Sequence, residues 1–227
     1  MGAGGIVGKR LFIAVDIDDA TREQIGRISS GLRETIDTLA KASWVRPDRM
    51  HLTLHFFGDA DAALEQRVRE ALAHPIAEPA FDLSFQGLGC FPERGSPRVL
   101  WLGIRDGAGA LRRIHTALAG RGLRRARPER ANEPFTPHLT LARFRPSTRA
   151  RDALRPLEAR ERILRAKSAE IADIPAFAGP SRIDRVTLYE SRLSPASLDL
   201  RSGRPEVARR AGPTYLPLAE ALLTGSG

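Results

Sequence analysis

The sequence predicts an α+β fold of two similar lobes that join into one compact unit. The tetrapeptide His-Leu-Thr-Leu occurs at positions 51–54 and again, 87 positions later, at 138–141. Around each copy, segments with the two-residue alternation of strands interleave with segments that have the three- and four-residue spacing of helices. A duplicated motif in matching surroundings indicates an internal repeat, not two domains on a linker.

Each copy of the motif has the pattern of a half-buried strand. Successive side chains of a strand point to opposite faces, so His51 and Thr53 share one face while the two leucines share the other. The leucine face can pack into a core and the His-Thr face can line a cleft. Two such strands facing each other would bring two imidazoles and two hydroxyls to one point.

The other expected elements follow in chain order. Residues 9–17 are an apolar run typical of a buried strand, and Asp18 supplies the cap of an amphipathic helix that reaches about position 42. We expect a loop over 87–97, a disordered leader at 1–8, one bilobal domain over 9–227 and an irregular polar loop over 194–213. Further helices are expected over 62–74, 111–123 and 150–164, and further strands at 44–45, 51–57, 81–85, 98–104, the second motif, 176–178, 183–189 and, at a sheet edge because of its proline, 214–218.

Charge and composition narrow the class of protein. The chain carries 36 basic and 27 acidic residues, and a net charge of +9 favours polyanionic partners such as nucleic acid. Lysine occurs only at positions 9, 41 and 167, so arginine-biased codon usage is the competing explanation. No apolar run approaches 18 residues, so we expect no membrane contact. Cys90 is the only cysteine, which excludes an internal disulfide; we expect a packed, unreactive thiol and a cytoplasmic location.

Two histidines with neighbouring hydroxyls suit chemistry at phosphorus. One imidazole can take a proton from an attacking water while the other gives a proton to the departing oxygen. The hydroxyls of Thr53 and Thr140 can donate hydrogen bonds to the non-bridging phosphate oxygens. This chemistry needs no metal and no cofactor.

The two His-Xaa-Thr-Xaa motifs resemble those of the two-histidine (2H) phosphoesterase superfamily, and within it the RNA 2',3'-cyclic phosphodiesterases, also called 2'-5' RNA ligases. The extra residues 1–8 and the long polar stretch 196–213 depart from the family pattern. The resemblance extends over almost the whole chain, in the segments RLFIAVDI from Arg10, WVRPDRMHLTLHFFGD from Trp44, GLGCFP from Gly87, RVLWLG from Arg98, FTPHLTLAR from Phe135 and RVTLYESRLSP from Arg185.

The resemblance implies a bilobal fold with pseudo-two-fold symmetry, an antiparallel sheet flanked by helices in each lobe, and an active-site cleft between the lobes. It implies hydrolysis of an RNA 2',3'-cyclic phosphate to a 2'-phosphate, with His51 as the proton donor to the departing 3' oxygen and His138 as the proton acceptor that activates water. The expected partner is RNA with cyclic phosphate ends, such as tRNA fragments, and a monomer is expected. Weak reverse ligation that forms 2'-5' linkages follows from microscopic reversibility.

Three further residues are candidates for the cleft. The resemblance places Arg143 near the phosphate, whereas strand parity puts it on the leucine side unless the strand ends or bulges. His55 shares parity with His51 and could line the cleft, although the second copy has an alanine at that place. Phe56 could stack on a base or belong to the core.

Other interpretations stay open at this point. His51, His55 and His138 could form a zinc site by ligand type. Arginines could hold the RNA backbone or simply face solvent, and His74 and His115 are expected to be structural or surface residues. The chain could also be a non-catalytic RNA- or nucleotide-binding module, or an enzyme for ADP-ribose 1'',2''-cyclic phosphate or 2'-5' oligoadenylates. The arginines in question are Arg112, Arg113, Arg121, Arg124, Arg125 and Arg127.

Overall fold

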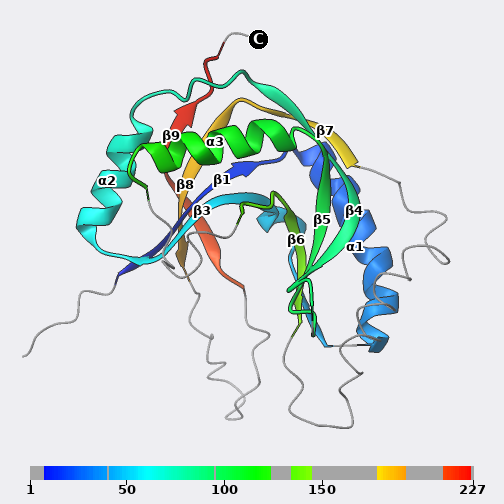
Figure 1. The fold of residues 1–227 in the computed structure, drawn as a ribbon. Helices are drawn as coiled ribbons and strands as arrows, with labels where there is room; N and C mark the ends of the chain where they lie inside the picture. The colour runs from blue at the N-terminus through cyan, green and yellow to red at the C-terminus, as the bar shows by residue number, and fades with distance from the viewer. Residues whose placement is uncertain are drawn as a thin grey trace, which may run out of the picture.

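Two antiparallel sheets frame the molecule in a computed structural model that describes residues 8–39, 41–94, 96–123, 134–144, 178–192 and 212–225 (Figure 1). We call the four-stranded sheet, with order β3-β1-β8-β9, sheet A, and the five-stranded sheet, with order β2-β6-β5-β4-β7, sheet B. Sheet A contains β1 (Lys9–Asp16), β3 (His51–Ala60), β8 (Arg185–Arg192) and β9 (Thr214–Leu222). Sheet B contains β2 (Ala42–Trp44), β4 (Phe81–Phe91), β5 (Val99–Asp106), β6 (Leu139–Phe144) and β7 (Ala178–Ile183). The α+β class with two antiparallel sheets is confirmed.

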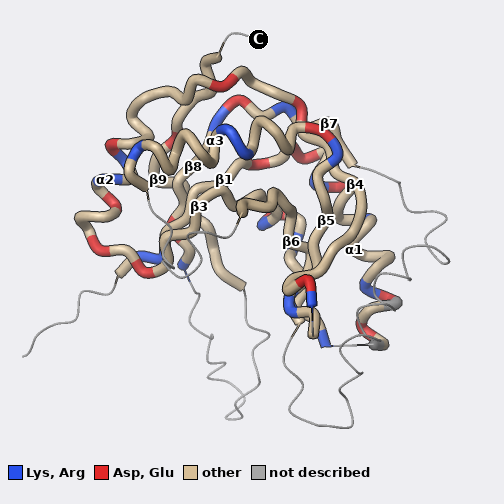
Figure 2. Tube along the Cα trace, viewed as in Figure 1, with Lys and Arg blue, Asp and Glu red and all other residues tan. Residues whose placement is uncertain are grey.

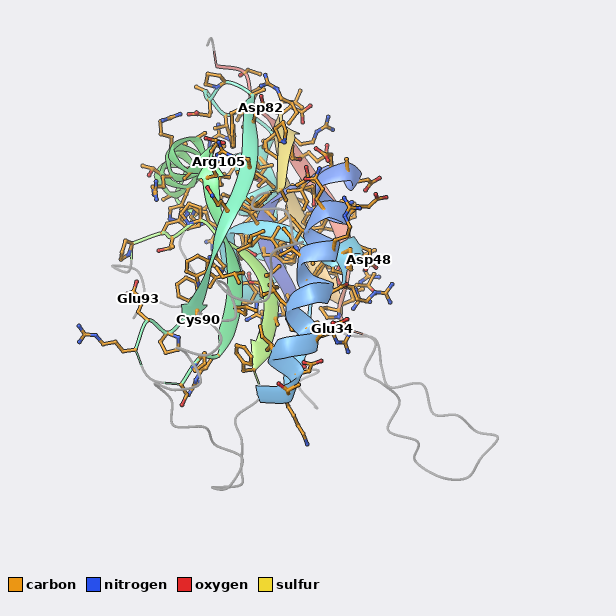
Figure 3. All side chains as sticks on the ribbon, turned by 90° about the vertical axis from the view of Figure 1, so that its right-hand side faces the viewer. Glu34, Asp48, Asp82, Cys90, Glu93 and Arg105 are labelled. Carbon is orange, nitrogen blue, oxygen red and sulfur yellow. The ribbon has the colours of Figure 1, made fainter. Side chains whose placement is uncertain are left out.

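Each sheet combines strands from the early and the late part of the chain. Sheet A joins β1 and β3 to the late strands β8 and β9, while the early strand β2 pairs with β6 in sheet B. The helix α1 (Asp19–Leu39) follows β1 of sheet A but packs along β2 and β7 of sheet B, beside the 3-10 turn η1 (Pro47–Arg49) (Figures 1 and 3). Both α2 (Ala62–Leu72) and α3 (Ala108–Gly120) contact β3 of sheet A. The spacing of the two motifs alone does not predict that strands from both ends of the chain pair in one sheet.

Apolar faces of strands and helices meet in one core. Strand β1 buries five consecutive residues, as the apolar run predicts. In α1, Ile25, Ile28, Leu32 and Ile36 are buried at helical spacing, and the Asp18 carboxylate accepts a hydrogen bond from the Thr21 amide at 2.7 Å as a cap. Cys90 is buried within sheet B, as predicted (Figure 3).

Residues 87–91, where the sequence predicts the start of a loop, belong to strand β4, and the described residues from Pro92 to Arg98 form no strand. Strand β4 runs from Asp82 near one end to Cys90 near the other (Figure 3), with register shifts where it pairs with β5. The glycines serve close packing here, because a Cβ added at Gly89 would lie 2.1 Å from the ring of Trp101. Helix α1 ends at Leu39, short of the expected 42, and β9 extends beyond the expected 218.

Several expectations lie outside the described residues. These are the helix over 150–164, the strand residues 176–177, nearly all of the loop over 194–213, and the leader except Gly8. Strand β9 is an edge strand of sheet A, as its proline predicts. In the described part of the chain, no helix is long and apolar enough to cross a membrane.

Leu188→Ala should lower the free energy of unfolding by about 2–5 kcal/mol, because Leu188 is fully buried in the centre of sheet A. Leu222→Ala, on the neighbouring strand β9, is the matched control, since the Leu222 side chain is 52% exposed. It should change stability by less than about 0.5 kcal/mol. Urea titration of both variants measures the difference, and equal losses would contradict the assigned core.

Candidate active site

The two motif strands lie beside each other, one in each sheet. His51 begins β3 of sheet A, and His138 directly precedes β6 of sheet B. The two strands are in contact although they belong to different sheets (Figure 1). Both imidazoles are half-buried, as are the hydroxyl-bearing residues Thr53 and Thr140. The two copies of the motif therefore lie on strands that contact each other, and the convergence of their imidazoles on one substrate stays a prediction.

The two imidazole rings are held in the same way. Nδ1 of His51 lies 2.9 Å from the carbonyl oxygen of Arg49, and Nδ1 of His138 lies 2.8 Å from that of Thr136. A carbonyl oxygen only accepts, so each Nδ1 carries the proton and donates it. In the neutral ring, Nε2 is then the unprotonated nitrogen, which can accept a proton or, once protonated, donate one.

Both motif strands contain a β-bulge at the last leucine of the motif. In the pairing of β1 with β3, Thr53 faces Ala14 and His55 faces Ile13, which leaves Leu54 as the extra residue. In the pairing of β5 with β6, Thr140 faces Trp101 and Ala142 faces Leu100, which leaves Leu141 extra. A bulge of this kind reverses the parity of all residues that follow it.

The first bulge corrects the prediction that His55 lines the cleft. His55 is 2% exposed, and its Nε2 lies 3.1 Å from the carbonyl oxygen of His115 in α3. The two rings stack at 4.3 Å, and Nδ1 of His115 bonds the carbonyl oxygen of Leu54 at 3.0 Å. The His115 ring also stacks on Phe135 at 4.3 Å, so His115 is a structural residue, as predicted, that joins α3, β3 and the approach to the second motif.

The same two bulges place Phe56 and Arg143 on the faces of their strands that carry the motif histidines. The side chain of Phe56 is 37% exposed, and the guanidinium of Arg10 lies over its ring at 5.0 Å. Arg143 is exposed, and its charge lowers the pKa of both His51 and His138. The charge of one side chain thus acts in the same direction on both imidazoles.

The pKa of each catalytic candidate is below the ordinary value of histidine. Burial, which disfavours the imidazolium, is the largest cause for both rings. The hydrogen bond to the backbone carbonyl raises each pKa, and Arg143 lowers each. His51 has one further influence, the carboxylate of Asp16, which raises its pKa.

The surroundings of the two rings differ in kind. His51 stacks on Phe12 at 4.8 Å and forms a T-shaped contact with the Tyr215 ring at 5.0 Å. It borders a pocket of about 310 Å³ that Asp16, Arg49 and Tyr189 also line. His138 instead forms a T-shaped contact with the Phe91 ring at 4.9 Å and lies 6.1 Å from the Trp101 ring.

Sequence reasoning missed Asp16, Tyr189 and Tyr215. Asp16 ends the apolar run of β1, but only the strand register puts it opposite His51. The Tyr189 hydroxyl donates to Asp16 at 2.6 Å, and burial together with this hydrogen bond raises the pKa of the phenol. The two tyrosines come from β8 and β9, which no motif links to β3.

The zinc alternative fails on geometry. His55 faces α3 while His51 faces the opposite side of sheet A, so the three histidines do not converge. Within the described residues, no three His, Cys, Asp or Glu side chains gather in a way that could hold a metal ion.

Two of the predicted RNA-binding arginines have structural partners. Arg113 forms an ion pair with Glu78 at 2.6 Å, and Arg121 donates to the carbonyl oxygen of His74 at 2.8 Å, beyond the end of α2. On the described part of the chain, lysine and arginine are otherwise distributed over several elements (Figure 2). Arg112 is exposed, whereas Arg124, Arg125 and Arg127 lie outside the described residues.

Comparison with known proteins decides the family. The sequence profile of the 2'-5' RNA ligase superfamily matches residues 17–191. The chain belongs to this superfamily. It is 36% identical over 140 residues to the RNA 2',3'-cyclic phosphodiesterase of Archaeoglobus fulgidus, which covers 60% of this chain and 73% of the relative. It is 31% identical over 208 residues to that of Aeropyrum pernix, which covers 89% and 98%.

A solved structure of the superfamily agrees with the fold. The crystal structure of Escherichia coli LigT complexed with 3'-AMP matches with a TM-score of 0.58 and 26% identity, over 96% of this chain and 99% of LigT. The predicted membership among the 2H phosphoesterases is confirmed, and with it the classification of the chain as a phosphodiesterase.

Arg143→Gln should raise the pKa of both His51 and His138, because it removes a positive charge that disfavours both imidazolium ions. NMR titration of the ring Cε1 protons measures both values in one sample. Arg67→Gln, an exposed position on α2, should leave them unchanged. A response of only one histidine would show that the two rings do not share Arg143.

Proposed function

We propose that this 2H phosphoesterase hydrolyses the 2',3'-cyclic phosphate at RNA ends and leaves a 2'-phosphomonoester. One observation carries the proposal: two imidazoles whose tautomers are fixed in the same way belong to contacting strands, and the charge of Arg143 lowers the pKa of both. The relatives from Archaeoglobus fulgidus and Aeropyrum pernix are named for this activity, which supports the substrate class.

The proposed reaction is an in-line displacement at phosphorus. Nε2 of His138 takes a proton from water as the water oxygen bonds to phosphorus. The bond from phosphorus to the 3' oxygen breaks, and Nε2 of protonated His51 gives its proton to that oxygen. The 2' oxygen keeps the phosphate, and the two histidines have exchanged protonation states for one turnover.

Negative charge that develops on the non-bridging phosphate oxygens is stabilised by hydrogen-bond donors. We assign the hydroxyls of Thr53 and Thr140 to these oxygens, since each lies two residues after its histidine on the same strand face. We assign to Arg143, whose charge acts on both histidines, a contact with the phosphate, since a guanidinium suits bidentate contact with phosphate. The proposed reaction needs no metal and no cofactor.

The same displacement can use a 5'-hydroxyl in place of water as the nucleophile, which is the reverse of cleaving a 2'-5' linkage. Attack of that hydroxyl on the cyclic phosphate forms a 2'-5' linkage, so weak RNA ligation belongs to the proposal. We further propose that RNA ends such as those of tRNA fragments are the substrate, and that residues 9–227 act as one bilobal, monomeric domain in the cytoplasm. The net charge of +9 supports a polyanionic substrate.

His51→Ala and His138→Ala should each reduce turnover of an oligonucleotide with a 2',3'-cyclic phosphate end by about 10²–10⁴-fold, because each removes one proton-transfer group. Phosphorus NMR of the wild-type product should show a 2'-phosphate and no 3'-phosphate. Circular dichroism and thermal melting control for folding. Near-full activity in either variant would refute the two-histidine mechanism, and a chain that binds this RNA without turnover would be a binding module.

Phe56→Leu should weaken binding of longer RNA without affecting a cyclic mononucleotide. Phe56 lies beyond Thr53, about 14 Å along β3 from His51, which is too far for the terminal ribose. Stacking of a base on an aromatic ring contributes about 1–3 kcal/mol, so KM for an oligonucleotide should rise by about tenfold or more. Equal effects on both substrates, measured by steady-state kinetics, would exclude Phe56 from the RNA path.

A further inference from the structure

The two halves of the site are related by a strand-by-strand correspondence. The bulges at Leu54 and Leu141 align β3 with β6, and the pairing of these strands aligns β1 with β5. In this correspondence Ala14, which faces Thr53, is equivalent to Trp101, which faces Thr140. Every neighbour of one histidine can therefore be compared with its counterpart at the other.

The residue opposite each histidine differs between the halves. Asp16 faces His51 in the register of β1 with β3. In sheet B, Leu102 faces Leu139, so the next position of β5, Gly103, is the counterpart of Asp16. A Cβ at Gly103 would lie 2.6 Å from the carbonyl oxygen of Gln86, so packing excludes a carboxylate there.

A second difference supports the first. The Tyr189 hydroxyl holds the Asp16 carboxylate at 2.6 Å, and Tyr189 faces Phe12 across the β1–β8 pair. The equivalent position in sheet B is Phe91, which faces Val99 and has no hydroxyl. The tyrosine therefore anchors the carboxylate at His51, and neither member of this pair has a polar counterpart at His138.

Other charges near His51 do not reproduce this difference. Arg143 acts on both histidines with the same sign. Arg22, Arg49 and Asp48 line the pocket next to His51 together with Tyr215, but Asp16 is the carboxylate that acts on the His51 ring.

We propose that Asp16, anchored by Tyr189, is the positioning residue that makes His51 the proton donor and leaves His138 as the proton acceptor. This inference rests on the proposed function and supplies a physical cause for its two roles. A carboxylate beside an imidazole favours the protonated ring, as a general acid requires before turnover. A ring without such a partner stays neutral more readily, as a general base requires.

Titration of the free enzyme tests the inference without substrate. In Asp16→Asn, which keeps the shape of the side chain, the pKa of His51 should fall by about one unit while that of His138 stays in place. Asp16→Glu retains the charge and should restore most of the shift. Asp59→Asn makes the same chemical change at the far end of the β1–β3 pair and should alter neither histidine. NMR of the ring protons measures all variants.

The pH profile of kcat/KM, which reports the pKa values of the free enzyme, provides the second measurement. The alkaline limb reports loss of the proton from the donor, so Asp16→Asn should move this limb to lower pH by the same amount as His51 shifts. The value of kcat/KM above that limb should then fall by about tenfold, since one pH unit is one decade in protonated enzyme. If Asp16→Asn moved the acid limb and left the alkaline limb in place, His51 would be the proton acceptor, and the assignment of donor and acceptor would be wrong.

The outcomes separate the two proposals. An unchanged His51 pKa in Asp16→Asn, or an equal shift of His138, overturns the role of Asp16 while the histidine substitutions still test the phosphodiesterase. If the pKa of His51 alone shifts but the His51→Ala and His138→Ala enzymes stay active, the proposed function is wrong. Asp16 and His51 would then interact electrostatically without a role in catalysis.

Discussion

The hydrogen bond from each imidazole Nδ1 to the carbonyl oxygen two residues earlier is the constraint on which this site depends. It connects Arg49 to His51 and Thr136 to His138 with nearly equal lengths. Because the acceptor is a backbone carbonyl, the tautomer does not depend on any neighbouring side chain. A proline-containing segment before each motif strand supplies the carbonyl, so strand entry and ring orientation are set together.

The bulge at the last leucine of each motif changes which of the following residues share a face with the motif histidine. Before the bulge, His and Thr face the site; after it, the next residue turns into the core and the following one returns to the site. This parity change gives the first lobe a buried His55 under α3 and an exposed Phe56, and the second lobe a buried Ala142 and an exposed Arg143. Identical local geometry thus presents an aromatic ring on one side and a cation on the other.

Sequence patterns predict the elements and the two motif pairs well, because periodicity and duplication are local properties. The apolar run of β1, the amphipathic α1 and the proline of edge strand β9 each gave the observed element. Strict alternation placed His55 in the cleft and left Arg143 undecided, since a bulge has no signature in His-Leu-Thr-Leu itself. The exchange of β2, β8 and β9 between lobes, and with it Tyr189 and Tyr215, depends on pairing over long distances in sequence. Periodicity carries no information about such pairing.

A duplicated scaffold poses a chemical problem, because it offers two equivalent imidazoles to a reaction that needs one acid and one base. Burial and the shared Arg143 lower the pKa of both rings, so neither gives the two histidines opposite tendencies. The different roles of the two histidines have to come from positions where the two halves differ. Two such positions hold Asp16 and Tyr189 in sheet A, and their counterparts in sheet B are Gly103 and Phe91. The glycine is fixed by the close approach of β4, so the asymmetry of charge follows from the packing of sheet B.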